Sequence, residues 1–208
     1  GYGRSIDVLS KFIQNKRGNI FISSKIGILP PKNANLYLLA YKLKEIINIQ
    51  KVPKIFASKI KSQYSFQRFD KQTIVQHVEK TLFNLKTQYI DLLSLHHVSK
   101  EDINDENIYC LNKLVDSGKI RNFGFAPAEN YQFFINKKVN YLHLTRECFF
   151  ENKNKITESK YYLIHSIYGS NKQIKVEEKV YLQSAKNISI IISMFNKNHI
   201  DKNIELFS

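Results

Sequence analysis

Three residues of this sequence could cooperate in acid–base chemistry: Tyr2, Lys25 and His96. An ammonium group beside a phenol lowers the phenol's pKa, and a nearby histidine can hydrogen-bond the reacting oxygen. Lys25 follows the apolar run that starts at Ile20, and His96 follows the apolar run Tyr89–Leu95. A lysine at a strand end is more often simply solvated, and a lone histidine is more often structural. The grouping of the three types therefore carries the prediction of a site.

The elements that must position these residues are short strands alternating with helices. Strands buried in a parallel sheet lose the polar alternation because helices cover both faces. Six runs have this character: Ile20–Ile26, Tyr89–Leu95, Ile120–Ala126, Val139–Thr145, Tyr161–Ile167 and Ile188–Met194. Helical periodicity lies between or after most of them, in Ser5–Gln14, Asp70–Leu85, Asn107–Val115, Glu129–Ile135 and His199–Phe207. The alternation predicts βαβ units and an α/β fold with a parallel sheet. In a parallel barrel the strand carboxyl ends meet at one mouth, so Lys25 and His96 are expected to converge.

The connection between the first strand and the next helix is far longer than a usual βα loop. Residues 27–69 are therefore predicted to be an insert after a strand, with Pro30-Pro31 and a basic amphipathic stretch, Leu36–Ile49. The stretch is expected to be an extra surface helix packed on the barrel; the alternative is a lid or a partner-binding helix. Asp70 is expected to cap the helix after the insert, and Gly118 to be the C′ residue of a later one.

The composition predicts one domain over residues 1–208, since 43% hydrophobic and 12% aromatic residues can form one core. No apolar run approaches the roughly 20 residues that span a bilayer, so no membrane partner is expected. Cys110 and Cys148 are too few for a disulfide framework and lack metal-type spacing, which favours a cytoplasmic setting without a metal. The chain opens on Gly1-Tyr2-Gly3 without an initiator Met, as a fragment would.

The net charge of +14 raises the possibility of a nucleic-acid partner. The basic residues are scattered as single lysines among Asn and Ile, and no nucleic-acid motif accompanies them, so this partner is not expected. The few glycines form neither GxGxxG nor a Walker loop, and a Rossmann nucleotide site is not supported.

Several segments, taken in order along the chain, resemble the aldo-keto reductase superfamily. Tyr2–Ser5 is similar to the family's YGxSE segment, and Ile20–Lys25 to the strand that ends in its catalytic lysine. Asp70–Leu85 followed by Asp91–His96 resembles the family's long helix and its DLxxxH strand. The segment Gly118–Gly124 resembles GKIRxxG, and Ile190–Asn203 resembles the last strand, the cofactor-phosphate loop and the closing helix. Phe66–Asp70 and Leu144-Thr145 are similar to the branch that acts on sugar aldehydes and lactols.

The resemblance implies a (β/α)8 TIM-type barrel, with the first two strands not visible in this chain. It implies an oxidoreductase that uses NADP or NAD and no metal, and that reduces an aldehyde or ketone or oxidises a sugar lactol in carbohydrate metabolism. By the same resemblance, Tyr2 would donate the proton, Lys25 would tune Tyr2, and His96 would orient the carbonyl oxygen. Cofactor contacts would fall on His143, His165, Ser166, Ser170, Ser193, Asn196 and Asn203.

The chain also departs from the family pattern. The Ser-Asn pair that holds the nicotinamide amide falls on Ala126-Pro127, neither of which has a side chain that can form hydrogen bonds. The Gln that follows falls on His143, which can still donate one bond, and the stacking aromatic falls on His165. The aspartate that pairs with the lysine would precede Gly1. These departures keep open two alternatives to an enzyme: a non-catalytic binding or regulatory member, and a degenerate chain. The substrate, the cofactor form and the oligomeric state stay open too.

Overall fold

A parallel sheet organises the chain. The computed structural model describes residues 4–29, 65–66, 69–129, 131–137, 139–167, 174–192 and 197–207. Six strands pair in parallel in the order β1-β4-β5-β6-β7-β8. Their bounds are β1 Ser23–Ile26, β4 Ile90–Val98, β5 Ile120–Pro127, β6 Tyr141–Thr145, β7 Tyr161–His165 and β8 Ile188–Ile190. The predicted α/β class with six parallel strands is confirmed.

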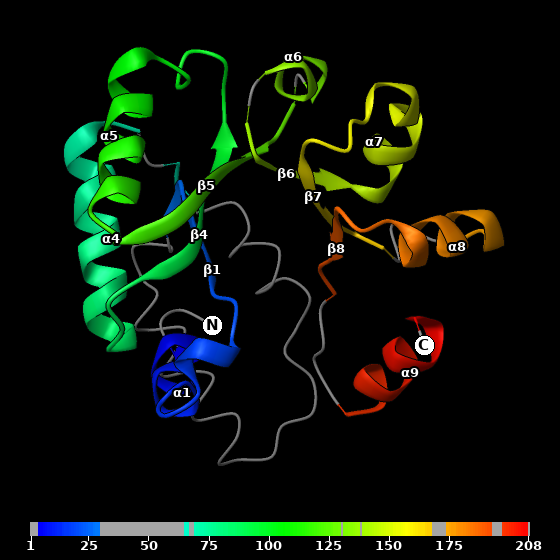
Figure 1. Cartoon of the computed structure of the whole chain (residues 1–208), viewed down its shortest axis with the longest axis horizontal. Helices are drawn as coiled ribbons and strands as arrows, with labels where there is room; N and C mark the ends of the chain where they lie inside the picture. Colours follow the sequence, from blue (N-terminus) through cyan, green and yellow to red (C-terminus); the bar gives the residue numbers. More distant parts are fainter. Residues whose placement is uncertain are drawn as a thin grey trace.

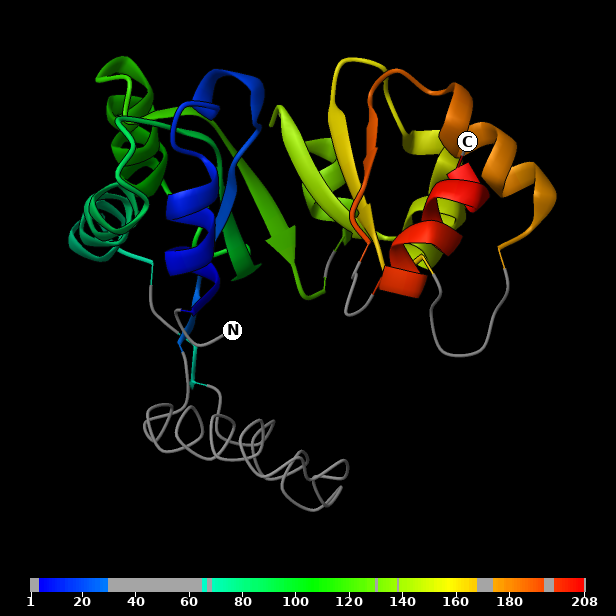
Figure 2. The same ribbon diagram turned by 90° about the horizontal axis from the view of Figure 1, so that it is seen from below.

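Helices alternate with these strands along the chain. They are α1 Arg4–Phe12, α4 Lys71–Leu85, α5 Asp105–Asp116, α6 Tyr131–Asn136, α7 Arg146–Glu151, α8 Val176–Ser184 and α9 Lys197–Phe207, with short 3-10 helices Arg17–Asn19 and Lys153–Lys155. In both ribbon views, α4 and α5 lie beside β4 and β5, whereas α7 and α8 lie at the other end of the sheet with β7 and β8 (Figure 1, Figure 2). Within the described ranges β1 and β8 are both edge strands, so the sheet is open.

One face of the sheet forms the core with the helices. Leu93, Leu95, Phe125, Leu144 and Ile164 alternate along the central strands and are completely buried. Helix α7 packs on this face through Phe149, whose ring lies 5.6 Å from that of Tyr162 on β7. Burying a side chain of this size contributes roughly 1.5–3 kcal/mol, so this face supplies much of the stability.

The two predicted helix ends have the expected local structure. The Asp70 carboxylate accepts a hydrogen bond of 2.8 Å from the backbone N–H of Thr73, which satisfies one of the free donors at the start of α4. Gly118 follows the last turn of α5 with φ of 72°, a left-handed conformation that glycine adopts without steric cost. Both boundaries are thus fixed by single residues.

The first strand is shorter than predicted because side chains take over its early backbone groups. The Ile20 carbonyl accepts a bond from Arg17, and the Ile22 N–H donates to the Asp91 carboxylate, so regular pairing begins only at Ser23. Helices α7 and α8 were not predicted. Neither was the short antiparallel pair of β2 (Ile28–Leu29) and β3 (Ser65–Phe66) at the base of the insert. The stretch Leu36–Ile49 lies outside the described residues.

In the described part of the chain, no helix is both long enough and apolar enough to cross a membrane.

Candidate functional site

The face of the sheet opposite the core carries several polar side chains among apolar ones such as Leu92 and Leu163. Its register runs from Lys25 through Ser94, Gly124 and Tyr141 to Tyr161, across five adjacent strands. Residues in register on parallel strands point to the same side, as do residues two apart on one strand. Three histidines therefore lie on the same face further along β4, β6 and β7: His96, His143 and His165. We call Lys25 and these three residues the lysine–histidine cluster.

Lys25 is the last residue but one of β1. Its side chain reaches solvent, yet the protein around it lowers the pKa of the ammonium through partial desolvation. No hydrogen bond or ion pair to another described residue is found for it. Lys25 is a cause of the lowered pKa of all three histidines in the cluster.

His96 lies near the carboxyl end of β4, where the strand is irregular. The pairing with β5 shifts between His96 and Val98, and His97 between them has φ of 61°. A bulge of this kind bends a strand and redirects its side chains. Burial first, and then Lys25, lower the pKa of His96 to about 4. The imidazole is therefore neutral at pH 7 and can donate one hydrogen bond.

A glycine holds the backbone next to His96. Gly27 has φ of 128°, and a Cβ built there would lie 2.2 Å from the His96 carbonyl oxygen and 2.7 Å from the Phe69 ring. Only glycine allows this approach. The backbone of the turn after β1 therefore lies in close contact with the end of β4, and Lys25 and His96 lie at the same end of the sheet.

His143 is the most buried member of the cluster, with 1% of its surface exposed. Its Nε2 lies 2.8 Å from the hydroxyl of Ser94, which is also completely buried. Its Nδ1 has no hydrogen-bond partner among the described residues. Burial first, then Lys25 and the other two histidines, lower its pKa to about 3. The His143 imidazole is therefore neutral at pH 7 and is held by Ser94, and its Nδ1 has no hydrogen-bond partner among the described residues.

His165 ends β7 and is paired in register with Thr145. Its Nδ1 lies 3.1 Å from the hydroxyl of Ser166, a residue with φ of 56° just after the strand. Burial and Lys25 lower its pKa. No carboxylate is among the groups that shift the pKa values of the cluster, and its only cationic group at pH 7 is the Lys25 ammonium.

The structure describes only some of the remaining predicted site residues. Tyr2, Ser170, Ser193 and Asn196 lie outside the described residues. Asn203 is buried on α9. Ala126 and Pro127, which take the place of the family's Ser-Asn pair, are buried at the end of β5.

Sequence reasoning missed Ser94. Its signal was present, because it stands two residues before His96 and so shares its face, but a serine inside an apolar strand gave no reason to single it out.

In the described part of the chain, no group of three or more His, Cys, Asp or Glu residues could hold a metal ion.

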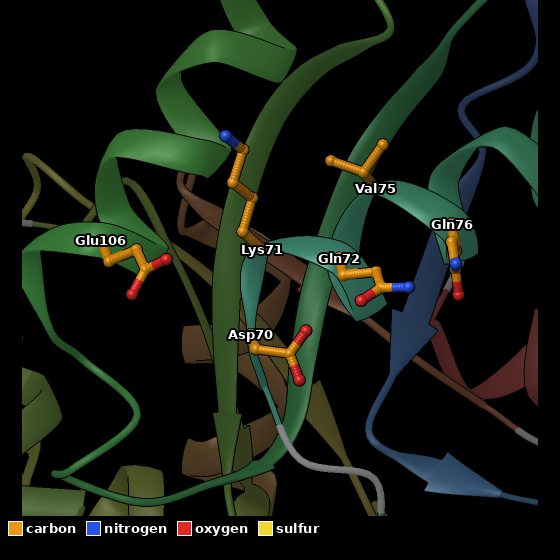
Figure 3. A pocket seen from close by; sticks show the side chains of 6 residues that line it. All are labelled: Asp70, Lys71, Gln72, Val75, Gln76 and Glu106. Carbon is orange, nitrogen blue, oxygen red and sulfur yellow. The ribbon is translucent and has the colours of Figure 1, made fainter.

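A hollow of about 440 Å³ lies elsewhere, at the first turns of α4 and α5. Figure 3 shows the side chains that line it: Asp70, Lys71, Gln72, Val75, Gln76 and Glu106. Asp70 is already engaged in capping α4, and Glu106 stands in the first turn of α5, where an acidic group stabilises the helix. The acidic groups of this hollow therefore have structural explanations.

Comparison with known proteins identifies the family. The sequence model of the Aldo/keto reductase family matches residues 1–139, which include β1, β4, β5 and the helices between them. The chain belongs to the aldo/keto reductase family. The match ends before β6, so His143 and His165 lie beyond it. No curated protein matches the sequence.

Solved aldo-keto reductases match nearly the whole chain. A protein of Pseudomonas aeruginosa described as an aldo-keto reductase is 16% identical with a TM-score of 0.64, covering 98% of this chain and 72% of its own. AKR11C1 of Bacillus halodurans, in its holo form, is 15% identical with a TM-score of 0.63, covering 98% and 72%. An aldo/keto reductase of Klebsiella pneumoniae, solved with NADP and acetate, is 14% identical with a TM-score of 0.58, covering 99% and 70%. These similarities show the fold: the open sheet is part of an aldo-keto reductase (β/α)8 barrel.

Proposed function

We propose that this chain is an NADP(H)-dependent oxidoreductase that reduces a small aldehyde or ketone, or oxidises the matching alcohol or sugar lactol. The observation that carries the proposal is the placement of Lys25 and His96 on neighbouring strands, on one face and at one end of the parallel sheet. Strand carboxyl ends are where barrels of this type hold their catalytic residues.

The cofactor is supported by one polar atom of this chain. Ala126 and Pro127 offer no side-chain hydrogen bond to a nicotinamide amide. His143, which stands where the family has Gln, has a buried Nδ1 without a hydrogen-bond partner in the part of the chain that the structure describes. Leaving such a group unpaired costs about 1–3 kcal/mol, which a ligand atom would recover. The residues therefore fit a nicotinamide ring held at a single point. The family resemblance and the solved relative with NADP favour the phosphorylated form.

When bound, the cofactor supplies the hydride. The chain's own residues handle the proton and the oxygen. His96, neutral at pH 7, donates one hydrogen bond to the carbonyl oxygen and holds it in place. Tyr2 gives that oxygen its proton, and the ammonium of Lys25 lowers the pKa of the Tyr2 phenol. The neutral state of His96 matters, because a charged imidazolium beside Lys25 would be repelled.

The proposal is tested by cofactor binding first and by turnover second. The chain has no Trp and 12 Tyr, so NADPH binding can be followed by quenching of tyrosine fluorescence. Oxidation of NADPH is then measured with a panel of aldehydes and sugars. Lys25→Met should lower the rate at least about a hundredfold, as expected for a residue that supports acid–base catalysis. Lys11→Met, on the exposed side of α1, is the matched control and should leave the rate unchanged. If the protein binds NADPH but turns over none of the substrates, the proposal of an enzyme is wrong and the protein only binds the cofactor.

A second function is favoured by Ala126 and Pro127, which are buried and supply no side-chain hydrogen bond to the amide. A non-catalytic binding or regulatory member of the family would lose these contacts without penalty. In that case NADPH at concentrations up to the millimolar range should neither quench the tyrosine fluorescence nor raise the melting temperature.

A further inference from the structure

The distance between the heavy atoms does not show whether Ser94 or His143 is the donor of the buried hydrogen bond between them. Their 2.8 Å contact allows two arrangements. Either the serine hydroxyl donates to Nε2 and the imidazole proton sits on Nδ1, or Nε2–H donates to the serine and Nδ1 is a bare acceptor.

Counting unsatisfied groups decides between them. Ser94 is completely buried and makes no other hydrogen bond among the described residues. If it accepts from Nε2–H, its own proton has no acceptor and Nδ1 has no donor, so two buried groups are unsatisfied. If it donates to Nε2, Nδ1–H is the one group of this pair left without a partner among the described residues. One unsatisfied group fewer favours the arrangement in which Ser94 donates to Nε2, on the order of tenfold in population.

Because the His143 ring is neutral, the two hydrogen-bond arrangements correspond to its two tautomers. Burial, followed by Lys25, His165 and His96, keeps the pKa of His143 far below neutrality. The ring therefore carries a single proton at pH 7, and the hydrogen bond at one nitrogen determines which nitrogen holds it.

We propose that Ser94 is a positioning residue that fixes His143 as an Nδ1–H donor, so that the ligand group bound at this point must be a hydrogen-bond-accepting oxygen. In the proposed function, on which this half of the inference rests, that oxygen is the amide oxygen of the nicotinamide and not its NH2 group. The site then fixes the orientation of the nicotinamide amide with one hydrogen-bond donor, whereas the family pattern uses several side chains.

Histidine tautomers are measured directly by 15N NMR on the protein without cofactor. The His143 Nδ1 should give the signal of a protonated nitrogen, and Nε2 that of a bare one. Ser94→Ala should shift the population toward Nε2–H or give a mixture. Ser166→Ala removes the analogous hydroxyl beside His165 and should leave the His143 signals unchanged. A protonated Nε2 in the unsubstituted protein would overturn the assignment.

Two cofactor analogues test the ligand half. The acetylpyridine analogue of NADP keeps the oxygen and lacks the NH2 group, and should bind within about threefold of NADP. The thionicotinamide analogue replaces the oxygen by a weak acceptor and should bind about tenfold more weakly. His143→Leu should abolish this difference. The reverse order of the analogues would refute the donor role. If the NMR result is as expected but none of the three binds, the proposed function fails and the role of Ser94 stands.

Discussion

Burial of His143 should give the stability of this protein a pH dependence that one substitution removes. Its pKa is lowered from the ordinary 6.5 to about 3. In the unfolded chain the same imidazole takes up a proton below about pH 6.5. Between these two values the unfolded state binds one more proton than the folded state, so stability falls as the pH falls. Above about pH 6.5 both states are neutral at this residue, and its contribution is constant.

The magnitude follows from the size of the shift. Each pH unit inside the window costs about 1.4 kcal/mol, and the whole window costs on the order of 5 kcal/mol. That is comparable to the total stability of many domains, so His143 alone could bring the protein close to acid unfolding. His143→Gln keeps a neutral side chain that can still hydrogen-bond Ser94, and it removes the titration.

The assay is urea unfolding of both proteins at several pH values, followed by circular dichroism. Carboxylates titrate in both proteins, so the difference between the two curves isolates His143. We expect this difference to change by about 1.4 kcal/mol per pH unit between about pH 6 and about pH 4. Because burial is the larger cause and Lys25 the smaller one, the change should persist at high salt. Two curves that run parallel would refute the claim that His143 is buried and neutral.

Two further substitutions test how the site is held. Gly27→Ala places a methyl group against the His96 carbonyl in a backbone conformation that alanine disfavours, and should cost at least about 2 kcal/mol in urea unfolding; Gly18→Ala, with open space around its Cβ, should change stability by less than about 0.5 kcal/mol. Asp91→Ala leaves Arg17 and the Ile22 N–H without their carboxylate and should cost about 3–5 kcal/mol, against less than about 1 kcal/mol for the exposed Asp116→Ala; equal losses would contradict the buried pair.

The sequence was sufficient for the sheet because its signals are local. Runs such as Tyr89–Leu95 bury both faces and show little alternation, and Gly118 and Asp70 fix helix ends by backbone conformation and a single side-chain bond. The start of β1 could not be predicted in this way. It depends on Arg17, which donates to the Ile20 carbonyl, and on a carboxylate 69 residues further along the chain, which accepts from Ile22.

The same limit applies to the site. That Lys25 and His96 would come to one end of the sheet followed from their places at strand ends. Ser94 did not follow, because its role depends on the hydrogen bond to a histidine 49 residues away. Helix α7 was missed for a related reason: its six residues are too few to show a period, and its position is set by the packing of Phe149 on Tyr162.

The two ends of the sheet differ in how their polar groups are paired. At the amino end, Arg17 donates to two backbone carbonyls, to Thr87 and to Asp91, and its guanidinium lies 3.8 Å from the centre of the Tyr89 ring. Every group in that network has a partner. At the carboxyl end the Lys25 ammonium and the His143 Nδ1 have none among the described residues. A buried polar group without a partner costs free energy in the empty protein, and a ligand that pairs it recovers that cost as affinity.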